Sequence, residues 1–281
     1  MRSAPISERL RLGAMREGWR LRARLRCQGL VPVARRMGAS VPGQVWLAAV
    51  MRNERARLPF FLEYYRKLGI GHFLMVDNAS TDGSASYLAE QPDVSLWHTS
   101  GSYRAARFGA DWINGLLSRH AVGRWVLTVD LDEFFVYPFC ESRPIRALTD
   151  WLESASARAF PAMLIDLYPK GPVASARHVE GQNPIDVAPW FDTGNYTYRR
   201  NPLFRNLWIQ GGARARAFFA DTPDLAPALN KIPLVRWQKK YVYASSTHML
   251  LPRGLNLVYE EWGGERASGA LLHAKLLDLF P

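Results

Sequence analysis

The chain has 281 residues, of which 48% are hydrophobic and 12% aromatic, so it can bury one large core or two small ones. This composition excludes disordered and fibrous proteins. Two cysteines, Cys27 and Cys140, exclude a disulfide framework, and no apolar run approaches the roughly 20 residues that a transmembrane helix needs. The first 30 residues also lack the apolar core of a signal peptide, so we expect a cytoplasmic protein.

The net charge of +11 is concentrated at the N-terminus. Residues 1–40 hold ten arginines and two glutamates, a net charge of +8, which leaves only +3 for the other 241 residues. Leucines and Trp19 are interleaved with these arginines, a pattern that indicates a basic amphipathic helix. Such a helix would make the protein peripheral at the anionic inner face of a membrane, and a solvated arm is the alternative. We expect no nucleic-acid partner, because the rest of the chain lacks a matching basic and aromatic face.

These charges divide the chain into a basic leader and a body. The leader comprises residues 1–40 and the body residues 41–281, with Gly38 to Gly43 as the linker between them. We expect the body to be a single domain. Its residues 41–143 would form a nucleotide-binding half and its residues 144–281 an acceptor half.

The first half of the body alternates apolar strands with amphipathic helices. This rhythm predicts βαβ units, and therefore an α/β fold with a mainly parallel sheet and flanking helices. Each strand end then carries polar residues to one rim of the sheet, which is where such sheets bind ligands. The strands are expected at 44–50, 73–76, 94–97 and 124–129, and the helices at 58–68, 85–90 and 105–119.

The strand at 124–129 continues directly into two carboxylates. Residues two apart on an extended chain point the same way, so Asp130 and Asp132 should converge at the strand end. Two hard oxygen ligands in that place suit Mn²⁺ or Mg²⁺, which would also bind substrate phosphates. An isolated Asp-x-Asp is more often an acidic turn that only caps a strand. Its meaning therefore depends on the other motifs.

A second polar loop, Asp77 to Ser84, follows the strand at 73–76. A carboxylate at such a strand end can accept hydrogen bonds from a nucleotide base or a ribose hydroxyl. The turn after it exposes backbone N–H groups and a helix N-terminus, and Asp82 and Ser84 are placed to cap the next helix. A turn of this kind is usually structural on its own. The informative feature is the order of the two loops along the chain.

The second half of the body is less regular. We expect a helix at 144–152 and a strand at 162–167. The stretch 168–201 is rich in Pro, Gly and Asn, and long loops of this kind are usually functional or disordered. Its aromatic side chains favour function, because aromatic faces suit sugar rings as well as packing. They are Trp190, Phe191, Tyr196 and Tyr198.

Together these motifs resemble the GT-A-fold glycosyltransferases of the family 2 type, in particular the bacterial family 2-like branch. The resemblance spans about residues 44–277 and leaves out the leader. It implies a GT-A (Rossmann-like) nucleotide-diphospho-sugar transferase fold. It also implies a nucleotide-sugar donor, a divalent metal held by the Asp-x-Asp, and inversion at the anomeric carbon. The acceptor stays open, as a polysaccharide or a lipid-linked glycan. The similar stretches are 51–54, 77–84, 125–134, 191–196, 211–214, 231–237 and 271–275.

The resemblance also implies roles for individual residues. Asp130 and Asp132 match the ligands of the metal and the diphosphate, and His273 matches a histidine that completes the metal site. A structural role is the alternative for His273. On the nucleotide side the matching residues are Asn53, Glu54, Asp77, Asp82, Asp130 and Lys275, with Lys275 near the diphosphate.

The catalytic base is the weakest of these assignments. An inverting transfer needs a carboxylate that deprotonates the acceptor hydroxyl, and the Glu-Asp motif usual in family 2 is absent here. We expect Asp192 to be the base, since it lies in an aromatic stretch, with Asp166 and Asp221 as poorer candidates. A turn or helix-cap role is the alternative for Asp192.

Two other functions fit parts of the sequence. A nucleotidyltransferase on a related sheet would need a Gly-rich phosphate loop after the first strand, and residues 51–54 lack the glycines. A non-catalytic adaptor that binds nucleotide sugars or membranes would not need the three aspartates Asp77, Asp130 and Asp132. We therefore expect a glycosyltransferase.

Overall fold

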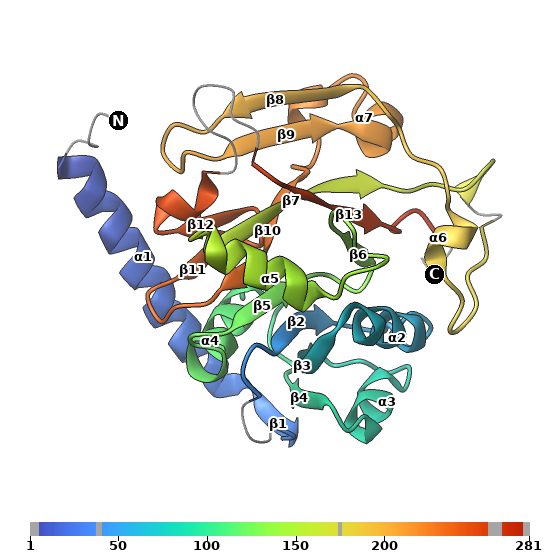
Figure 1. Cartoon of the computed structure of the whole chain (residues 1–281). Helices are drawn as coiled ribbons and strands as arrows, with labels where there is room; N and C mark the ends of the chain where they lie inside the picture. The colour runs from blue at the N-terminus through green and yellow to red at the C-terminus, as the bar shows by residue number, and fades with distance from the viewer. Residues whose placement is uncertain (1–5, 38–40, 174–175, 258–265, 278–281) are drawn as a thin grey trace.

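A nine-stranded mixed sheet forms the centre of the described molecule (Figure 1). The computed structural model describes residues 6–37, 41–173, 176–257 and 266–277. The strand order is β1-β4-β3-β2-β5-β10-β7-β13-β6. The bounds of these strands are β1 Val31–Ala34, β2 Val45–Met51, β3 Ile70–Asp77, β4 Val94–His98, β5 Trp125–Thr128, β6 Glu133–Val136, β7 Ala159–Asp166, β10 Asn230–Arg236 and β13 Gly269–His273.

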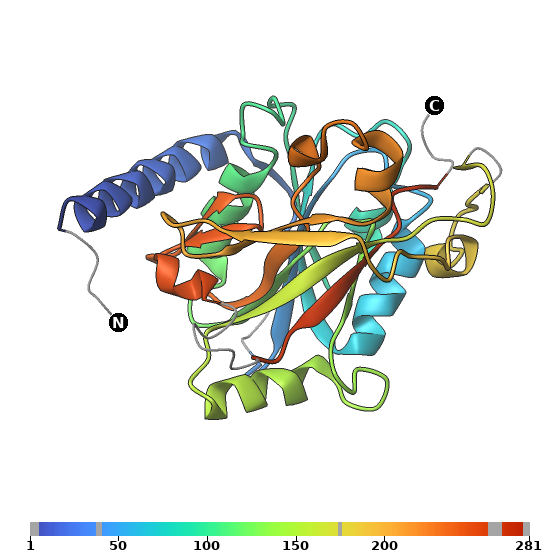
Figure 2. The ribbon, with the colours of Figure 1, turned by 90° about the horizontal axis from the view of Figure 1, so that it is seen from above.

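Helices cover both faces of the sheet, so the predicted α/β class is confirmed (Figures 1 and 2). The alternation of side chains along β2 assigns the helices to faces. Leu47 and Ala49 face a core shared with α2, α3 and α5, whereas Trp46 and Ala48 face a core shared with α4. The helices are α1 Ile6–Arg26, α2 Leu58–Leu68, α3 Ser84–Glu90, α4 Ala110–His120, α5 Ile145–Ser154, α6 Pro184–Val187 and α7 Gly212–Phe218.

The sheet is parallel in its first half and mixed in its second. Strands β4, β3, β2 and β5 run parallel, as the βα alternation predicts. Beyond β5 the chain inserts β10, antiparallel to both β5 and β7, and then β13, which is parallel to β7 and antiparallel to β6. The strands of the second half therefore pair with partners far away in sequence, which local periodicity does not reveal.

Most elements expected in the first half form within a few residues of their predicted bounds. The helix expected at 105–119 begins only at Ala110, because Arg107, Phe108 and Gly109 adopt positive φ angles that end any regular helix before them. Two small sheets were not expected. They are β8 Tyr196–Arg200 with β9 Leu207–Gly211, and β11 Val242–Ser245 with β12 Met249–Leu251.

The leader forms the predicted helix, α1, and one side of that helix packs against the body (Figure 1). Arg22 donates from Nε to the buried carboxylate of Asp111 at 2.7 Å, and Trp19 stacks on Phe204 at a centroid distance of 6.5 Å. Residues 31–34 then join the sheet as β1, at the edge beside β4. Leader and body therefore share a core in this structure. The expected linker at 38–43 lies partly outside the described residues, because 38–40 are not described.

Among the described residues, no helix combines the length and the apolar character that crossing a membrane would require.

Gly115 of α4 permits the close approach of α1, and we use it to test that packing. A Cβ at Gly115 would overlap Cys27 Sγ and lie 3.0 Å from the Ala23 carbonyl oxygen. We expect Gly115→Ala to lower the free energy of unfolding by about 1–3 kcal/mol in urea denaturation, because the added methyl group would overpack the contact between α1 and α4.

Gly18→Ala is the matched control, since Gly18 lies inside α1 with no atom within 4 Å of the added Cβ. Alanine there should stabilise the protein by about 0.5–1 kcal/mol through helix propensity alone. Stabilisation by both substitutions would contradict the docked position of α1.

Candidate functional site

The site lies at the carboxyl ends of β2, β3 and β5, in a cavity of about 330 Å³. This is the rim at which α/β sheets bind ligands. The cavity lining mixes carboxylates with cationic side chains. It is formed by Val50, Met51, Arg52, Glu54, Asn78, Tyr103, Asp130, Leu131, Asp132, His273 and Lys275.

Asp130 and Asp132 both line the cavity, but through a different backbone geometry from the one expected. They lie in a tight turn between β5 and β6 and not on an extended strand. The Glu133 amide donates to the Asp130 carbonyl oxygen at 3.1 Å, which closes the turn. Leu131, between the two aspartates, points into the core and is buried. The turn therefore directs two carboxylates to one cavity while anchoring itself in the protein interior.

A buried lysine fixes this turn from the neighbouring strand. Lys231 on β10 is 4% exposed, and its Nζ donates to Asp130 Oδ2 at 3.1 Å and to Glu133 Oε1 at short range. Burial alone would lower the pKa of Lys231, but the charges of Asp130 and Glu133 raise it above the usual value. Lys231 therefore stays protonated and neutralises part of the carboxylate cluster.

His273 connects the turn to the second half of the sheet. It is the last residue of β13, paired with Glu133 on β6 and with Asp166 on β7. Its Nδ1 lies 2.7 Å from Asp166 Oδ1 and its Nε2 lies 3.2 Å from Asp132 Oδ2. Burial disfavours the charged ring, but the two aspartates raise the pKa of His273 to about 9. The charge of His273 in turn holds the pKa of the partly buried Asp132 well below its usual range.

Asp166 is itself held in place. Arg214 of α7 donates from Nε to Asp166 Oδ2 at 2.8 Å, so the carboxylate uses its other oxygen for His273. A carboxylate behind a histidine fixes the tautomer and the orientation of the ring in many metal sites. Asp166, which we expected as a poorer base candidate, is hydrogen-bonded to His273 and to Arg214 in this structure, and its role as a base stays a prediction.

The residues expected on the nucleotide side separate into two groups. Glu54 and Lys275 line the cavity with the aspartates. Asn53 and Asp82 instead connect two rim loops: the Asn53 Oδ1 accepts from the Thr81 amide at 2.8 Å, and the Asp82 Oδ2 accepts from the Arg55 amide at 2.9 Å. Nucleotide contact by Asn53 and Asp82 stays a prediction, and their observed contacts shape the rim.

Asp77 is completely buried at the end of β3. Its Oδ2 lies 2.8 Å from His98 Nδ1, and its Oδ1 accepts from the Ser80 amide at 3.2 Å. Asn78, the next residue, lines the cavity in its place. Contact between Asp77 and a nucleotide also stays a prediction. The His98 ring bonded to this carboxylate is half-exposed.

Asp192 lies outside the cavity lining. Arg216 binds both of its carboxylate oxygens at 3.0 Å, and Tyr168 donates a hydroxyl to Oδ1 at 3.0 Å. The hydrogen bonds from Arg216 hold the pKa of Asp192 below its usual value. A base in this position would hold protons weakly while this ion pair persists.

Sequence reasoning missed several residues of the site. Arg52 and Asn78 directly follow strands, so the strand-end rule that selected Asp77 and Glu54 also covers them. Lys231 lies within a stretch that carries the family resemblance, but no periodicity indicates that its amine reaches Asp130. Tyr103 comes from the segment before α4 and had no signal in the sequence.

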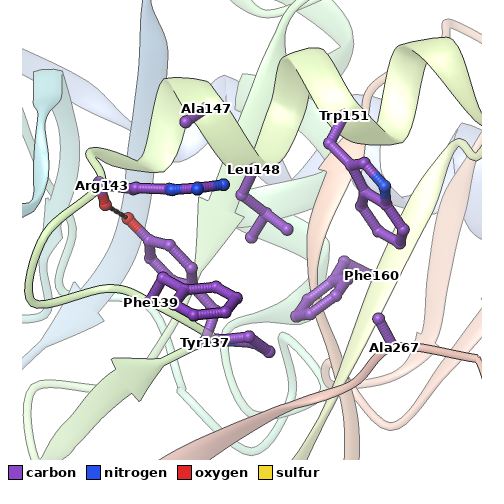
Figure 3. A pocket seen from close by; sticks show the side chains of 9 residues that line it. Tyr137, Phe139, Arg143, Ala147, Leu148, Trp151, Phe160 and Ala267 are labelled. Atoms are coloured by element: carbon purple, nitrogen blue, oxygen red, sulfur yellow. Dashed lines mark hydrogen bonds between the residues drawn. The ribbon is translucent and has the colours of Figure 1, made fainter.

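A second cavity, of about 250 Å³, lies between α5 and the segment after β6 (Figure 3). Its lining is apolar and aromatic, and Tyr137 closes one end by donating its hydroxyl to the Arg143 carbonyl oxygen at 2.6 Å. Trp151 and Phe160 project into it from α5 and β7 (Figure 3). Among the described residues that line this cavity there is no carboxylate.

The residues present in the first cavity fit a divalent cation. Ligand atoms of Asp132, Glu133 and His273 lie within 4.8 Å of one another. Two carboxylates and one imidazole are acceptable to Mn²⁺, and the carboxylates suit Mg²⁺ as well. Lys231 is bound to Glu133 Oε1 and to Asp130 Oδ2, so Asp132 and His273 are the ligands most readily offered, with the other carboxylate oxygen of Asp130 across the same turn.

No protein-family model matches the chain, and no curated protein matches it. Solved structures with partial similarity include a 4-diphosphocytidyl-2C-methyl-D-erythritol synthase, at 15% identity and a TM-score of 0.29 over 50% of this chain and 66% of that one. A second is described as a glucose-1-phosphate thymidylyltransferase from Bacillus anthracis, at 9% identity and a TM-score of 0.28 over 49% and 65%. The chain thus spans slightly less than two thirds of either structure. Similarity at this level identifies no family.

The buried ion pair between Lys231 and Glu133 can be tested through stability. Lys231→Met leaves the 1% exposed side chain of Glu133 without its cation, so we expect the free energy of unfolding to fall by about 3–5 kcal/mol. The double variant Lys231→Met/Glu133→Gln removes both charges and should recover a large part of that loss. Urea denaturation measures both values. Equal stability of the single and double variants would contradict the ion pair.

Proposed function

We propose that this protein is a metal-dependent glycosyltransferase that uses a nucleotide-diphosphate sugar as donor. The observation that supports it most directly is the pair Asp130 and Asp132, which line one cavity at a strand end together with His273 and Lys275. A sugar transfer from such a donor develops negative charge on the leaving diphosphate. Cations in a partly enclosed site stabilise that charge as the glycosidic bond breaks.

In this proposal different residues of the cavity bind the metal, the diphosphate and the nucleoside. Asp132 and His273, with Asp130, would hold Mn²⁺ or Mg²⁺, which supplies the Lewis acid for the diphosphate. Lys275 and Arg52 add cationic side chains to the same lining, where a diphosphate would lie. Glu54, held by Arg57 at 2.6 Å, and Asn78 offer hydrogen-bond acceptors and donors to the nucleoside. The acceptor is a glycan or a lipid-linked glycan in this proposal, and inversion follows from the family resemblance alone.

Metal-dependent nucleotide binding is the first test. We expect a nucleoside diphosphate from a UDP, GDP, CDP, ADP and TDP panel to bind more tightly with Mn²⁺ than with EDTA in calorimetry. Asp132→Asn and His273→Ala should each remove most of that difference, by about tenfold or more in Kd, because each removes a metal ligand. The binding measured in EDTA should change little.

Asp186→Asn is the matched control, since it removes the same charge from an exposed position on α6. It should leave the metal effect intact. Equal nucleotide affinity of the unaltered protein in Mn²⁺ and in EDTA would refute the metal assignment. In turnover assays, release of pyrophosphate from a nucleoside triphosphate, without release of nucleoside diphosphate from a donor sugar, would indicate a nucleotidyltransferase instead.

The assignment of Asp192 as the base gives a second test. We expect Asp192→Asn to lower kcat by about 10²–10⁴-fold while donor binding is unchanged. Because its pKa lies below the usual value, the carboxylate stays deprotonated at neutral pH, and kcat should fall only as the pH drops through that depressed pKa. Asp150→Asn, at an exposed position on α5, serves as control. An unchanged kcat in Asp192→Asn would remove Asp192 from the mechanism.

A further inference from the structure

Helix α1 has two apolar sides, and only one of them is used by the fold. Leu12 and Ala23 are buried against the body, and Trp19 packs on Phe204 beside them. This side is the one that holds the helix on α4 and β11. The packing of α1 on the body therefore buries some of its apolar side chains and leaves other apolar side chains exposed to solvent.

The remaining apolar residues of α1 form a stripe on the outward side. Ile6, Leu10, Leu21 and Leu25 are 57–77% exposed. Their spacings of 4, 11 and 4 residues are each close to a whole number of turns at 3.6 residues per turn, so all four lie within about 100° of one another around the helix axis. Four exposed large aliphatic side chains in line on one helix are unusual for a surface that faces only water.

Among the described residues, four of the seven arginines of α1 have no acidic partner. Its two acidic residues are both engaged, Glu8 with Arg253 of the body and Glu17 with Arg16 and Arg20. In the part of the chain that the structure describes, several other arginines of α1 have no ion pair and no hydrogen-bonded partner. These are Arg9, Arg11, Arg24 and Arg26.

Beside this stripe, α1 and α4 enclose a basic cavity of about 370 Å³. Arg20 and Arg24 of α1 face Arg119 of α4 and Lys239 across it, with Gln28 and Ser118 as further polar lining. None of the described residues that line it is acidic. Arg24 lies three residues from Leu21 and therefore on the adjacent side of the helix, which places the cavity next to the apolar stripe.

We propose that α1 docks this protein on the surface of a bilayer that contains anionic phospholipids. The outward stripe enters the interfacial region, and the cavity between α1 and α4 takes a lipid headgroup phosphate. Basic residues next to an apolar helix face are the combination that binds such surfaces. A second copy of this strongly basic helix would be repelled, and nucleic acid would leave the aliphatic stripe in water.

Vesicle co-sedimentation of the full chain tests the docking. We expect binding to phosphatidylcholine vesicles that contain 30 mol% phosphatidylglycerol, and at least tenfold weaker binding to pure phosphatidylcholine vesicles. Raising the salt to 0.5 M should weaken binding to the anionic vesicles strongly, because exposed charges are then screened. Equal binding to both kinds of vesicle, or binding to neither, would overturn the proposal.

The apolar stripe is tested by Leu21→Glu/Leu25→Glu, which changes exposed positions and should leave the fold intact. We expect at least tenfold weaker binding to the anionic vesicles, since the stripe can no longer enter the interface. The matched control is Phe218→Glu/Leu225→Glu, at positions that are 63% and 70% exposed elsewhere on the molecule. Undiminished binding of Leu21→Glu/Leu25→Glu, or an equal loss in the control, would overturn the role of the stripe.

The cavity is tested by Arg119→Gln/Lys239→Gln, two changes outside α1. We expect about tenfold weaker binding to the anionic vesicles or more, because each basic residue near the membrane contributes about fivefold. Lys67→Gln/Lys170→Gln removes the same charge from exposed positions distant from α1 in sequence and should bind as the unaltered protein does. If both double variants lose affinity equally, overall charge and not the cavity determines binding. None of these measurements depends on glycosyl transfer.

Discussion

The arrangement of the site depends on one buried cation, Lys231. Its strand, β10, is antiparallel to both β5 and β7, and so it joins the parallel first half of the sheet to the mixed second half. From this position the amine reaches the carboxylates of Asp130 and Glu133 at the two ends of the turn after β5. Without that cation, the buried carboxylate of Glu133 and the half-exposed carboxylate of Asp130 would repel each other. The turn that presents Asp132 to the cavity would then lose its support.

The second half of the sheet supplies a matching contact on the other side of the turn. The register of β13 sets His273 level with Glu133 on β6 and Asp166 on β7, so the ring can reach Asp132. Arg214 then fixes Asp166 from α7. The candidate metal ligands are therefore positioned by strand pairing and by a chain of charge-assisted hydrogen bonds, which hold a geometry more firmly than neutral ones do.

How far the sequence predicts this structure depends on the range of the contacts. The βα alternation of residues 44–129 is local, so periodicity and strand-end residues locate β2 to β5 and the cavity rim. The positions of β10 and β13 depend on pairing over about a hundred residues, which no local pattern reports. Contacts between side chains that are distant in sequence are equally invisible to local patterns. Asp77 is bonded to His98, and α1 contacts the body through Asp111 and Phe204.

The charge balance of the site explains why a divalent cation suits it. Lys231 compensates one carboxylate of Asp130 and Glu133, and Arg214 compensates Asp166. Asp132 and one further carboxylate then remain without a cation. Their negative charge favours a positive charge nearby, and the pKa of His273 is accordingly raised to about 9. A proton on His273 neutralises only one of these two negative charges. A dication bound by Asp132 and the ring would neutralise both, and would leave Lys275 and Arg52 free for an anionic ligand in the same cavity.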